Sequence, residues 1–134
     1  MPLLCCLVTT PAAAAACQEL EAAGFSLCRE PSPEVSGLVL DVPTPQTGEI
    51  PWDRLPEGCR VFGGNLTGVP EGFRAHDLLK DPIYAARNAD ITARCALRLA
   101  GGRLEETLAG LPVLVLGWGR IGKCLGRHLR SLGA

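Results

Sequence analysis

The chain of 134 residues carries 13 lysines and arginines against 14 aspartates and glutamates, a formal net charge of −1. This balance gives no electrostatic reason to expect nucleic acid or an anionic membrane as a partner. No stretch approaches the about 18 to 20 apolar residues of a membrane span. A nucleotide-binding domain together with a substrate domain usually needs about twice this length. We therefore expect one full domain and part of a second.

Cysteine and histidine usage argues for a reducing compartment and against a metal site. The seven cysteines contain no Cys-x-x-Cys pair, and several lie inside apolar runs, where cysteine packs as a small hydrophobic side chain. The two histidines, His76 and His128, lie in unrelated segments. The apolar start of the chain lacks the basic region of an export signal, because its first basic residue is Arg29. We expect a cytoplasmic protein without a bound metal.

Short apolar runs in the first half of the chain predict strands at residues 3–8, 25–28, 37–40 and 59–62, with a helix at 12–23. Because these strands are continuously apolar, they favour a parallel sheet covered on both faces. Ligands of such sheets gather beyond the carboxyl ends of the strands. The segments expected at this edge are Thr9 and Thr10, residues 42–44, and residues 63–65.

Two polar positions near this edge have competing interpretations. Asn65, after two glycines, is a candidate for a binding or catalytic side chain, but the same triplet is typical of a tight turn. His76 and Asp77 suggest a second hypothesis, in which the histidine acts as a general base that the aspartate orients. The alternative, which we favour, is an aspartate at a helix start beside an exposed histidine.

The second half of the chain begins with a helical pattern. Small residues recur at steps of three and four from about residue 81 until Gly101 and Gly102 end the pattern. Residues 102–112 indicate a polar connector with one helical turn. Residues 113–116 then predict an apolar strand, and residues 123–132 an amphipathic helix that ends at Gly133.

The loop between that strand and that helix is a dinucleotide-binding fingerprint, G-x-G-x-x-G, in its required strand–loop–helix context. Gly117 allows the tight turn, Gly119 lets the backbone approach a pyrophosphate, and Gly122 allows the helix to pack closely on the strand. The helix N-terminus favours the anion. The acidic residue that reads the ribose normally follows about 20 residues later, so NAD and NADP remain open. The expected cofactor-binding residues are Gly117, Trp118, Gly119, Arg120, Ile121 and Gly122.

The segment "DPIYAARNADITARCALRLAGGRLEETLAGLPVLVLGWGRIGKCLGRHLRSLGA" resembles the family of the dipicolinate synthase A chain. In that family an Asn-x-x-Pro-Thr-x-Glu helix, a polar connector and V-L-V-L-G-x-G-R-x-G follow a small flavodoxin-like domain. Asn88 and Thr92 match the helix, whereas Ile91 and Arg94 replace the usual Pro and Glu. Four loop residues match the fingerprint, namely Gly117, Gly119, Arg120 and Gly122.

The resemblance implies an α/β fold with a flavodoxin-like parallel-sheet domain at residues 1–84. A crossover helix and connector follow at 85–110, and the first strand, loop and helix of an NAD(P)-binding Rossmann domain at 111–134. It implies an oxidoreductase that uses NADP or NAD to oxidise a cyclic dihydro- or tetrahydrodipicolinate-type dicarboxylate to dipicolinate during sporulation. A flavoprotein-like second subunit is the implied partner. We expect the 134 residues alone to be inactive.

Several alternatives stay open. The same helix and fingerprint occur in D-2-hydroxyacid dehydrogenases and in adenosylhomocysteinase. Two further alternatives are a non-catalytic partner-binding module and a flavodoxin-like binding domain without a nucleotide role. Asn88 and Thr92 either contact substrate or nicotinamide, or serve as a helix cap or hinge and a solvent-facing threonine.

The apolar strand at residues 113–116 lacks the neighbours of its own sheet, and an unpaired strand of this kind pairs readily with another chain or docks on the first domain. We expect the isolated chain to form homo-oligomers. Light scattering checks this expectation, and a monomer with a disordered strand would contradict it.

Overall fold

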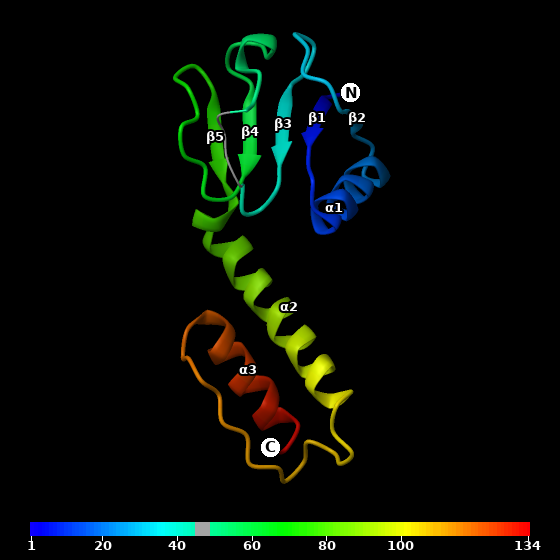
Figure 1. The fold of residues 1–134 in the computed structure, drawn as a ribbon, viewed down its shortest axis with the longest axis vertical. Coiled ribbons are helices and arrows are strands. Elements are labelled where there is room, and N and C mark those ends of the chain that lie inside the picture. Colours follow the sequence, from blue (N-terminus) through cyan, green and yellow to red (C-terminus); the bar gives the residue numbers. More distant parts are fainter. Residues whose placement is uncertain (45–48) are drawn as a thin grey trace. The chain divides into compact units, whose positions relative to one another are not determined.

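The structure is a computed structural model that describes residues 1–44 and 49–134 (Figure 1). Its contacts divide the chain into two units, Met1–Asp81 and Pro82–Ala134. Every strand of the described residues lies in the first unit, and the second consists of two helices and their connections. None of the helices in the described parts of the chain is both long and apolar enough to cross a membrane.

The N-terminal unit contains one parallel sheet with strands β1 (Leu3–Leu7), β2 (Ser26–Cys28), β3 (Gly37–Leu40), β4 (Arg60–Gly63) and β5 (Arg74–Asp77). The strand order is β2-β1-β3-β4-β5, and every neighbouring pair is parallel (Figure 1). This is the order of flavodoxin-like doubly wound sheets. The predicted α/β fold class is therefore confirmed, and the four predicted strands agree with the structure to within one residue at each end.

The sequence did not reveal β5, because Arg74-Ala75-His76-Asp77 contains no apolar run. This strand forms at the sheet edge by pairing with β4, with Phe62 beside His76 in the register. Its last residue, Asp77, also caps the short 3-10 helix η2 (Leu78–Lys80), where its carboxylate accepts a hydrogen bond from the Leu79 N–H. The interpretation of Asp77 as a helix-start residue is confirmed. The strand that precedes η2, β5, was not predicted from the sequence.

Helix α1 (Pro11–Ala22) makes the crossover from β1 to β2. Thr10 caps its N-terminus by accepting a hydrogen bond from the Ala13 N–H, and Pro11 occupies the first turn, where a missing N–H costs nothing. Gly24 follows the helix with φ +92°, a left-handed conformation that glycine adopts without strain. The helix thus starts and ends where the local sequence directs it.

The hydrophobic core lies on one face of the sheet. Cys5, Leu38 and Val61 occupy matching register positions on neighbouring strands, and all three are fully buried. Side chains from the connections complete this core, and they are Val35, Ile50, Leu55 and Cys59. A short 3-10 helix, η1 (Trp52–Arg54), adds Trp52, whose ring lies 5.0 Å from that of Phe73. Connections rather than α-helices therefore cover this face.

The opposite face carries Cys6, Val39 and Phe62, which alternate with the core positions along their strands. Helix α1 packs there, beside Cys6 and Leu27. Further along the same face, the rings of Phe62 and His76 stack at a centroid distance of 5.0 Å. Helix α1 is the one α-helix that the described residues of this unit form.

The C-terminal unit consists of α2 (Pro82–Gly101) packed against α3 (Arg120–Ser131) (Figure 1). The small residues Ala85, Ala89 and Ala93 are the buried ones on α2, which confirms the periodic helix seen in the sequence. A polar contact joins the two helices, since His128 Nε2 lies 2.7 Å from Asp90 Oδ1. Both helices thus bury one face within this unit.

Two local predictions differ from the structure here. The connector contains turns and bends between residues 102 and 112 but no helical turn. Residues 113–116 do not form a strand. A strand needs a hydrogen-bonded neighbour, and the described residues of this unit contain none. The apolar sequence is present, but the sheet that would define it as a strand is not.

We predict that Leu38→Ala destabilises the N-terminal unit by about 2–5 kcal/mol, because Leu38 is fully buried and its truncation leaves a cavity. Urea unfolding followed by Trp52 fluorescence, in a Trp118→Phe background, measures this unit. The control Glu19→Ala changes an exposed residue of α1 and should alter the stability by less than about 0.5 kcal/mol. Equal effects of the two variants would contradict the assigned core.

Candidate functional site

The glycine-rich loop before α3 turns sharply at its first glycine and packs closely at its third. Gly117 has φ +102°, which side-chain-bearing residues rarely adopt, so the chain turns sharply there. Gly122 is buried in the first turn of α3, and a Cβ built on it would overlap the carbonyl oxygen of Gly117. The first and third glycines are thus both required by the fold of the loop.

Gly119 differs from these two glycines, because nothing lies within 4 Å of a Cβ built on it. Its φ of −78° is open to any residue, so the protein itself does not require glycine here. Space is therefore open beside the Gly119 backbone, in the turn between residues 113–116 and α3. This is the position at which the fingerprint lets a pyrophosphate approach the backbone.

The N-terminus of α3 begins directly behind this open position. Gly119 is the N-cap, and it provides no side-chain hydrogen bond to the first turn. The first intrahelical bond runs from the Lys123 N–H to the Gly119 carbonyl, so the N–H groups of the turn before it have no helical partner. Arg120 is exposed in that turn. Backbone N–H groups, the helix dipole and a guanidinium together suit a phosphate group.

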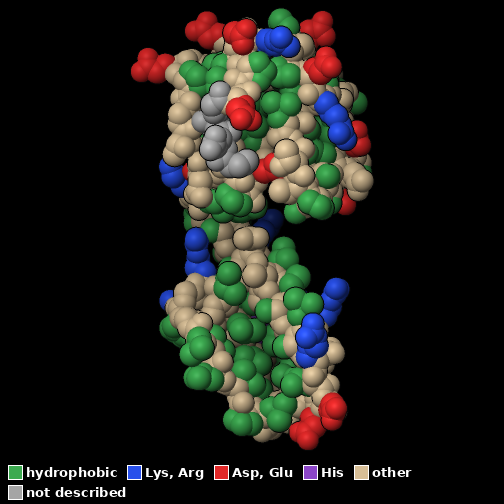
Figure 2. Space-filling model, viewed as in Figure 1, with side chains coloured by type: hydrophobic (Ala, Val, Ile, Leu, Met, Phe, Trp, Pro, Cys, Tyr) green, Lys and Arg blue, Asp and Glu red, His purple; other side chains and the backbone are tan. Residues whose placement is uncertain are grey.

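The other two loop residues have different surroundings. The indole of Trp118 lies 3.0 Å from a Cβ built on Gly126, so the ring packs back onto α3 rather than over Gly119. Trp118 nevertheless remains 59% exposed, and Ile121 is 44% exposed. Leu114 and Leu116, just before the loop, are 83% and 88% exposed. Figure 2 shows hydrophobic side chains gathered on the surface of this unit.

Asn88 and Thr92 lie on α2, four residues apart, and both are exposed. Because α2 begins at Pro82, Asn88 lies in its second turn, and the interpretation of Asn88 as a helix cap is wrong. The Thr92 hydroxyl donates to the Asn88 carbonyl at 2.7 Å, a bond that threonine commonly makes within helices. A role of either residue in binding substrate or nicotinamide stays a prediction.

Arg94, which replaces the glutamate of the family pattern, has a structural partner in the same helix. Its Nε donates to Asp90 Oδ2 at 2.8 Å, while the other oxygen of Asp90 contacts His128. The contact with His128, followed by that with Arg94, holds the pKa of Asp90 below its usual range. The carboxylate at position 90 therefore links α2 to α3 instead of serving as a free acid.

A second set of polar groups lies at the carboxyl ends of β1 and β3 in the N-terminal unit. Asp41, which follows β3, is 3% exposed and accepts four hydrogen bonds. Its donors are the Thr9 N–H (2.8 Å), the Thr9 hydroxyl (2.8 Å), the Thr10 N–H (3.1 Å) and the Thr10 hydroxyl (2.6 Å). Burial raises the pKa of Asp41, but the bonds from Thr10 and Thr9 outweigh it and lower the pKa to about 2.

The hydrogen-bonded edge continues from β3 to β4. The Thr44 hydroxyl donates to the Asp41 carbonyl at 2.8 Å and accepts from the Gly64 N–H at 3.1 Å, while the Thr44 N–H donates to the Gly64 carbonyl at 2.7 Å. A Cβ on Gly63 would collide with the Thr44 hydroxyl and the Leu66 side chain. The two glycines therefore serve this close approach, and residues 42–44 lie where the sequence predicted.

Asn65 and Asp77 close the edge at β5. Asn65 has φ +58°, and its N–H donates to Asp77 at 3.1 Å, as does that of Leu66 at 3.2 Å. Burial raises the pKa of Asp77, but these bonds, the Leu79 N–H and the nearby Lys80 together lower it. This geometry supports the tight-turn interpretation of Asn65. It does not test a ligand contact by the Asn65 side chain.

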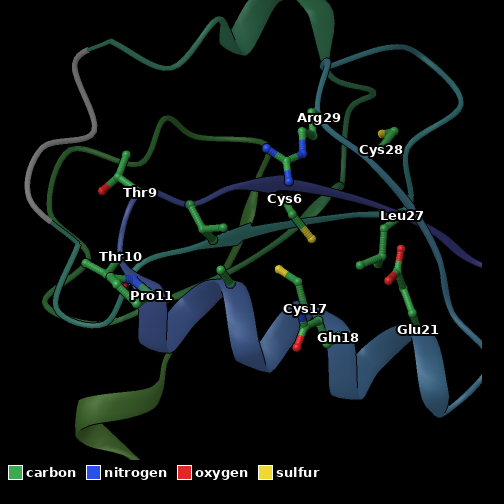
Figure 3. A pocket seen from close by; sticks show the side chains of 12 residues that line it. Cys6, Thr9, Thr10, Pro11, Cys17, Gln18, Glu21, Leu27, Cys28 and Arg29 are labelled. Carbon is green, nitrogen blue, oxygen red and sulfur yellow. The ribbon is translucent and has the colours of Figure 1, made fainter.

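A hollow of about 510 Å³ lies beside this edge, between α1 and the ends of β1 and β2 (Figure 3). Cys6, Cys17 and Cys28 are among the residues that line it, together with the polar residues Gln18, Glu21 and Arg29. Within residues 1–44 and 49–134, no group of three or more His, Cys, Asp or Glu side chains is arranged to hold a metal ion.

The edge segments lie where the sequence predicted, but Asp41, the residue that joins them, was not among the predicted residues. An aspartate directly after an apolar strand, opposite two threonines that follow another strand, is the signal that identifies it. Asp41 is ionised and fully hydrogen-bonded at neutral pH, so it positions the β1–α1 turn rather than transferring protons.

The fold and the loop together define an α/β protein with a flavodoxin-like sheet and a dinucleotide-type loop. The dipicolinate synthase A chain from Bacillus halodurans is a solved structure to which the protein is similar, with a TM-score of 0.60 and 21% sequence identity. The match covers 83% of this chain and 46% of that chain, so this chain spans about half of that protein's length. The likeness shows the fold that the sequence resemblance implied. No protein-family model and no curated protein matches the sequence.

We predict that Asp41→Asn lowers the free energy of unfolding by about 2–3 kcal/mol at neutral pH, because an amide cannot accept all four bonds. The folded-state pKa is depressed, so the stabilisation is present above about pH 4 and is lost as the pH falls towards 2. Wild-type stability should therefore fall by roughly 2 kcal/mol more than that of the variant over this interval. Urea titrations at several pH values measure it. The exposed Asp53→Asn is the control, and parallel curves for Asp41→Asn and wild type would reject the assignment.

Proposed function

We propose that this chain belongs to an NAD(P)-dependent oxidoreductase. It contributes the flavodoxin-like unit and the phosphate-binding loop and first helix of a dinucleotide-binding domain. The single observation that carries the proposal is the loop geometry at Gly117, Gly119 and Gly122. Two of these glycines are required by the fold of the loop itself, whereas Gly119 is required only if a ligand approaches it. A strand-to-helix turn without a ligand has no need for the open position.

In this proposal the residues of the loop bind and orient the cofactor. The N–H groups at the start of α3 hold the pyrophosphate, and Arg120 adds a charge-assisted hydrogen bond. Trp118, packed on α3 beside Gly126, keeps its ring clear of the pyrophosphate path. The nicotinamide, when bound, accepts or donates a hydride, and the protein supplies binding and orientation.

We further propose that the substrate is a small cyclic dicarboxylate of the dihydro- or tetrahydrodipicolinate type, oxidised to dipicolinate. The support is the fold shared with the dipicolinate synthase A chain together with the matching positions Asn88, Thr92 and Arg120. Arg94 departs from the pattern, because an arginine cannot supply the carboxyl group of the usual glutamate, and its Nε donates to Asp90 instead. Asn88 and Thr92 are then the side chains to test for substrate contact.

We predict that Gly119→Val weakens dinucleotide binding at least about tenfold, a loss of about 1.4 kcal/mol, because its methyl groups occupy the pyrophosphate position. The chain should still fold, since a Cβ there meets nothing in the protein. The measurement is a fluorescence titration with NADPH and with NADH, using the full-length protein that the gene encodes. Circular dichroism checks that the variant is folded.

Gly101→Ala is the matched control, because a Cβ at Gly101 also meets nothing within 4 Å, and this residue lies at the end of α2, away from the loop in sequence. Its affinity for the nucleotide should equal that of the wild type. The proposal fails if the wild-type protein binds neither nucleotide. It also fails if Gly119→Val binds as tightly as Gly101→Ala.

A further inference from the structure

Two cysteines of the N-terminal unit lie side by side at the hollow between α1 and the sheet. Cys6 belongs to β1 and Cys17 to α1, and both line the hollow of about 510 Å³. Figure 3 shows their sulfur atoms pointing toward one another across the gap between strand and helix. No part of the proposed dinucleotide loop takes part in this arrangement, which lies entirely in the first unit.

The two thiols differ in accessibility. Cys6 is 8% exposed, whereas Cys17 is half-buried on the hollow side of α1. Burial, with the adjacent Cys17 thiol as the next contribution, raises the pKa of Cys6 to about 12. Cys6 therefore stays protonated at neutral pH. Cys17 is the thiol that a small oxidant entering the hollow meets first.

Two other cysteines are also neighbours, but their surroundings differ. Cys5 and Cys28 occupy matching positions on β1 and β2, and their side chains belong to the opposite, core face of the sheet. Cys5 is fully buried, and the Cys28 thiol donates a weak hydrogen bond to the Glu30 carbonyl at 3.4 Å. In Figure 3 the Cys28 sulfur lies apart from the Cys6 and Cys17 pair. These two cysteines form an internal comparison for the reactivity of the first pair.

We propose that Cys6 and Cys17 form an oxidisable dithiol, which a small peroxide converts to a disulfide that ties β1 to α1. The hollow beside the pair admits the oxidant, and the facing side chains place the second thiol beside the first. Free cysteines packed as inert hydrophobic side chains need neither an opening to solvent nor a facing partner. Cys6 and Cys17 have both.

The chemistry balances with hydrogen peroxide as the two-electron oxidant. The Cys17 thiolate attacks one peroxide oxygen, so that an S–O bond forms, the O–O bond breaks, and the departing hydroxide takes up the proton of the Cys17 thiol to leave as water. The Cys6 sulfur then attacks the Cys17 sulfur, the S–O bond breaks, and hydroxide leaves with the Cys6 proton as a second water. Two thiols and one peroxide thus yield one disulfide and two waters.

The test is differential alkylation of the peroxide-treated chain at low protein concentration. A first reagent labels all free thiols under denaturing conditions, the disulfides are then reduced, and an isotopically heavier reagent labels the thiols so released. Trypsin leaves Cys5, Cys6, Cys17 and Cys28 in one peptide, because the first basic residue of the chain is Arg29. Tandem mass spectrometry locates the heavy label within that peptide.

The expected result is heavy label on Cys6 and Cys17 and light label on Cys5 and Cys28. In Cys17→Ser, Cys6 should retain the light label, because its partner is gone. Cys95→Ser removes an exposed cysteine from the other unit and should leave the labelling pattern unchanged. Three results would overturn the proposal: no heavy label in the wild type, heavy label on Cys5 and Cys28 instead, or heavy label confined to disulfide-linked dimers.

Discussion

The buried carboxylate of Asp41 is the interaction on which the arrangement of the N-terminal unit depends. An ionised group with 3% exposure is costly unless hydrogen bonds replace its water, and four donors from Thr9 and Thr10 do so. Because Thr10 also caps α1, the same residues fix the end of β1, the start of α1 and the end of β3. Thr9 and Thr10 also line the hollow beside α1.

Some glycines are required by close packing within the protein, whereas Gly119, inside the glycine-rich loop, is not. Gly63 and Gly64 allow the β3 and β4 ends to approach closely enough for the Thr44 bonds, and Gly122 allows α3 to pack on the Gly117 carbonyl. A methyl group at any of these three positions would force the neighbouring atoms apart. Gly119 has no such contact. The contrast between these positions is a stronger argument for a ligand than the fingerprint alone, since the spacing of glycines does not distinguish packing from binding.

The C-terminal unit shows how far helices alone can organise a segment whose sequence favours a mixed structure. Helices α2 and α3 bury Ala85, Ala89 and Leu129, and Asp90 joins His128 across their interface. Leu114 and Leu116 remain exposed, and no strand occurs among the described residues of this unit. The solved dipicolinate synthase chain to which this protein is similar is about twice as long, since the match covers 46% of it.

The sequence by itself determined the local elements: the apolar runs of β1, β3 and β4, the alanine spacing of α2 and the glycine loop before α3, because these depend on neighbours within a few residues. It also indicated the edge segments at Thr9, Thr44 and Asn65. Only the tertiary structure decided that β5 forms, that residues 113–116 form no strand, that Asp41 accepts four hydrogen bonds, and that the Cys6 and Cys17 side chains face one another. Each of these joins residues distant in sequence, and a pairing of that kind has no signature in the spacing of either partner alone.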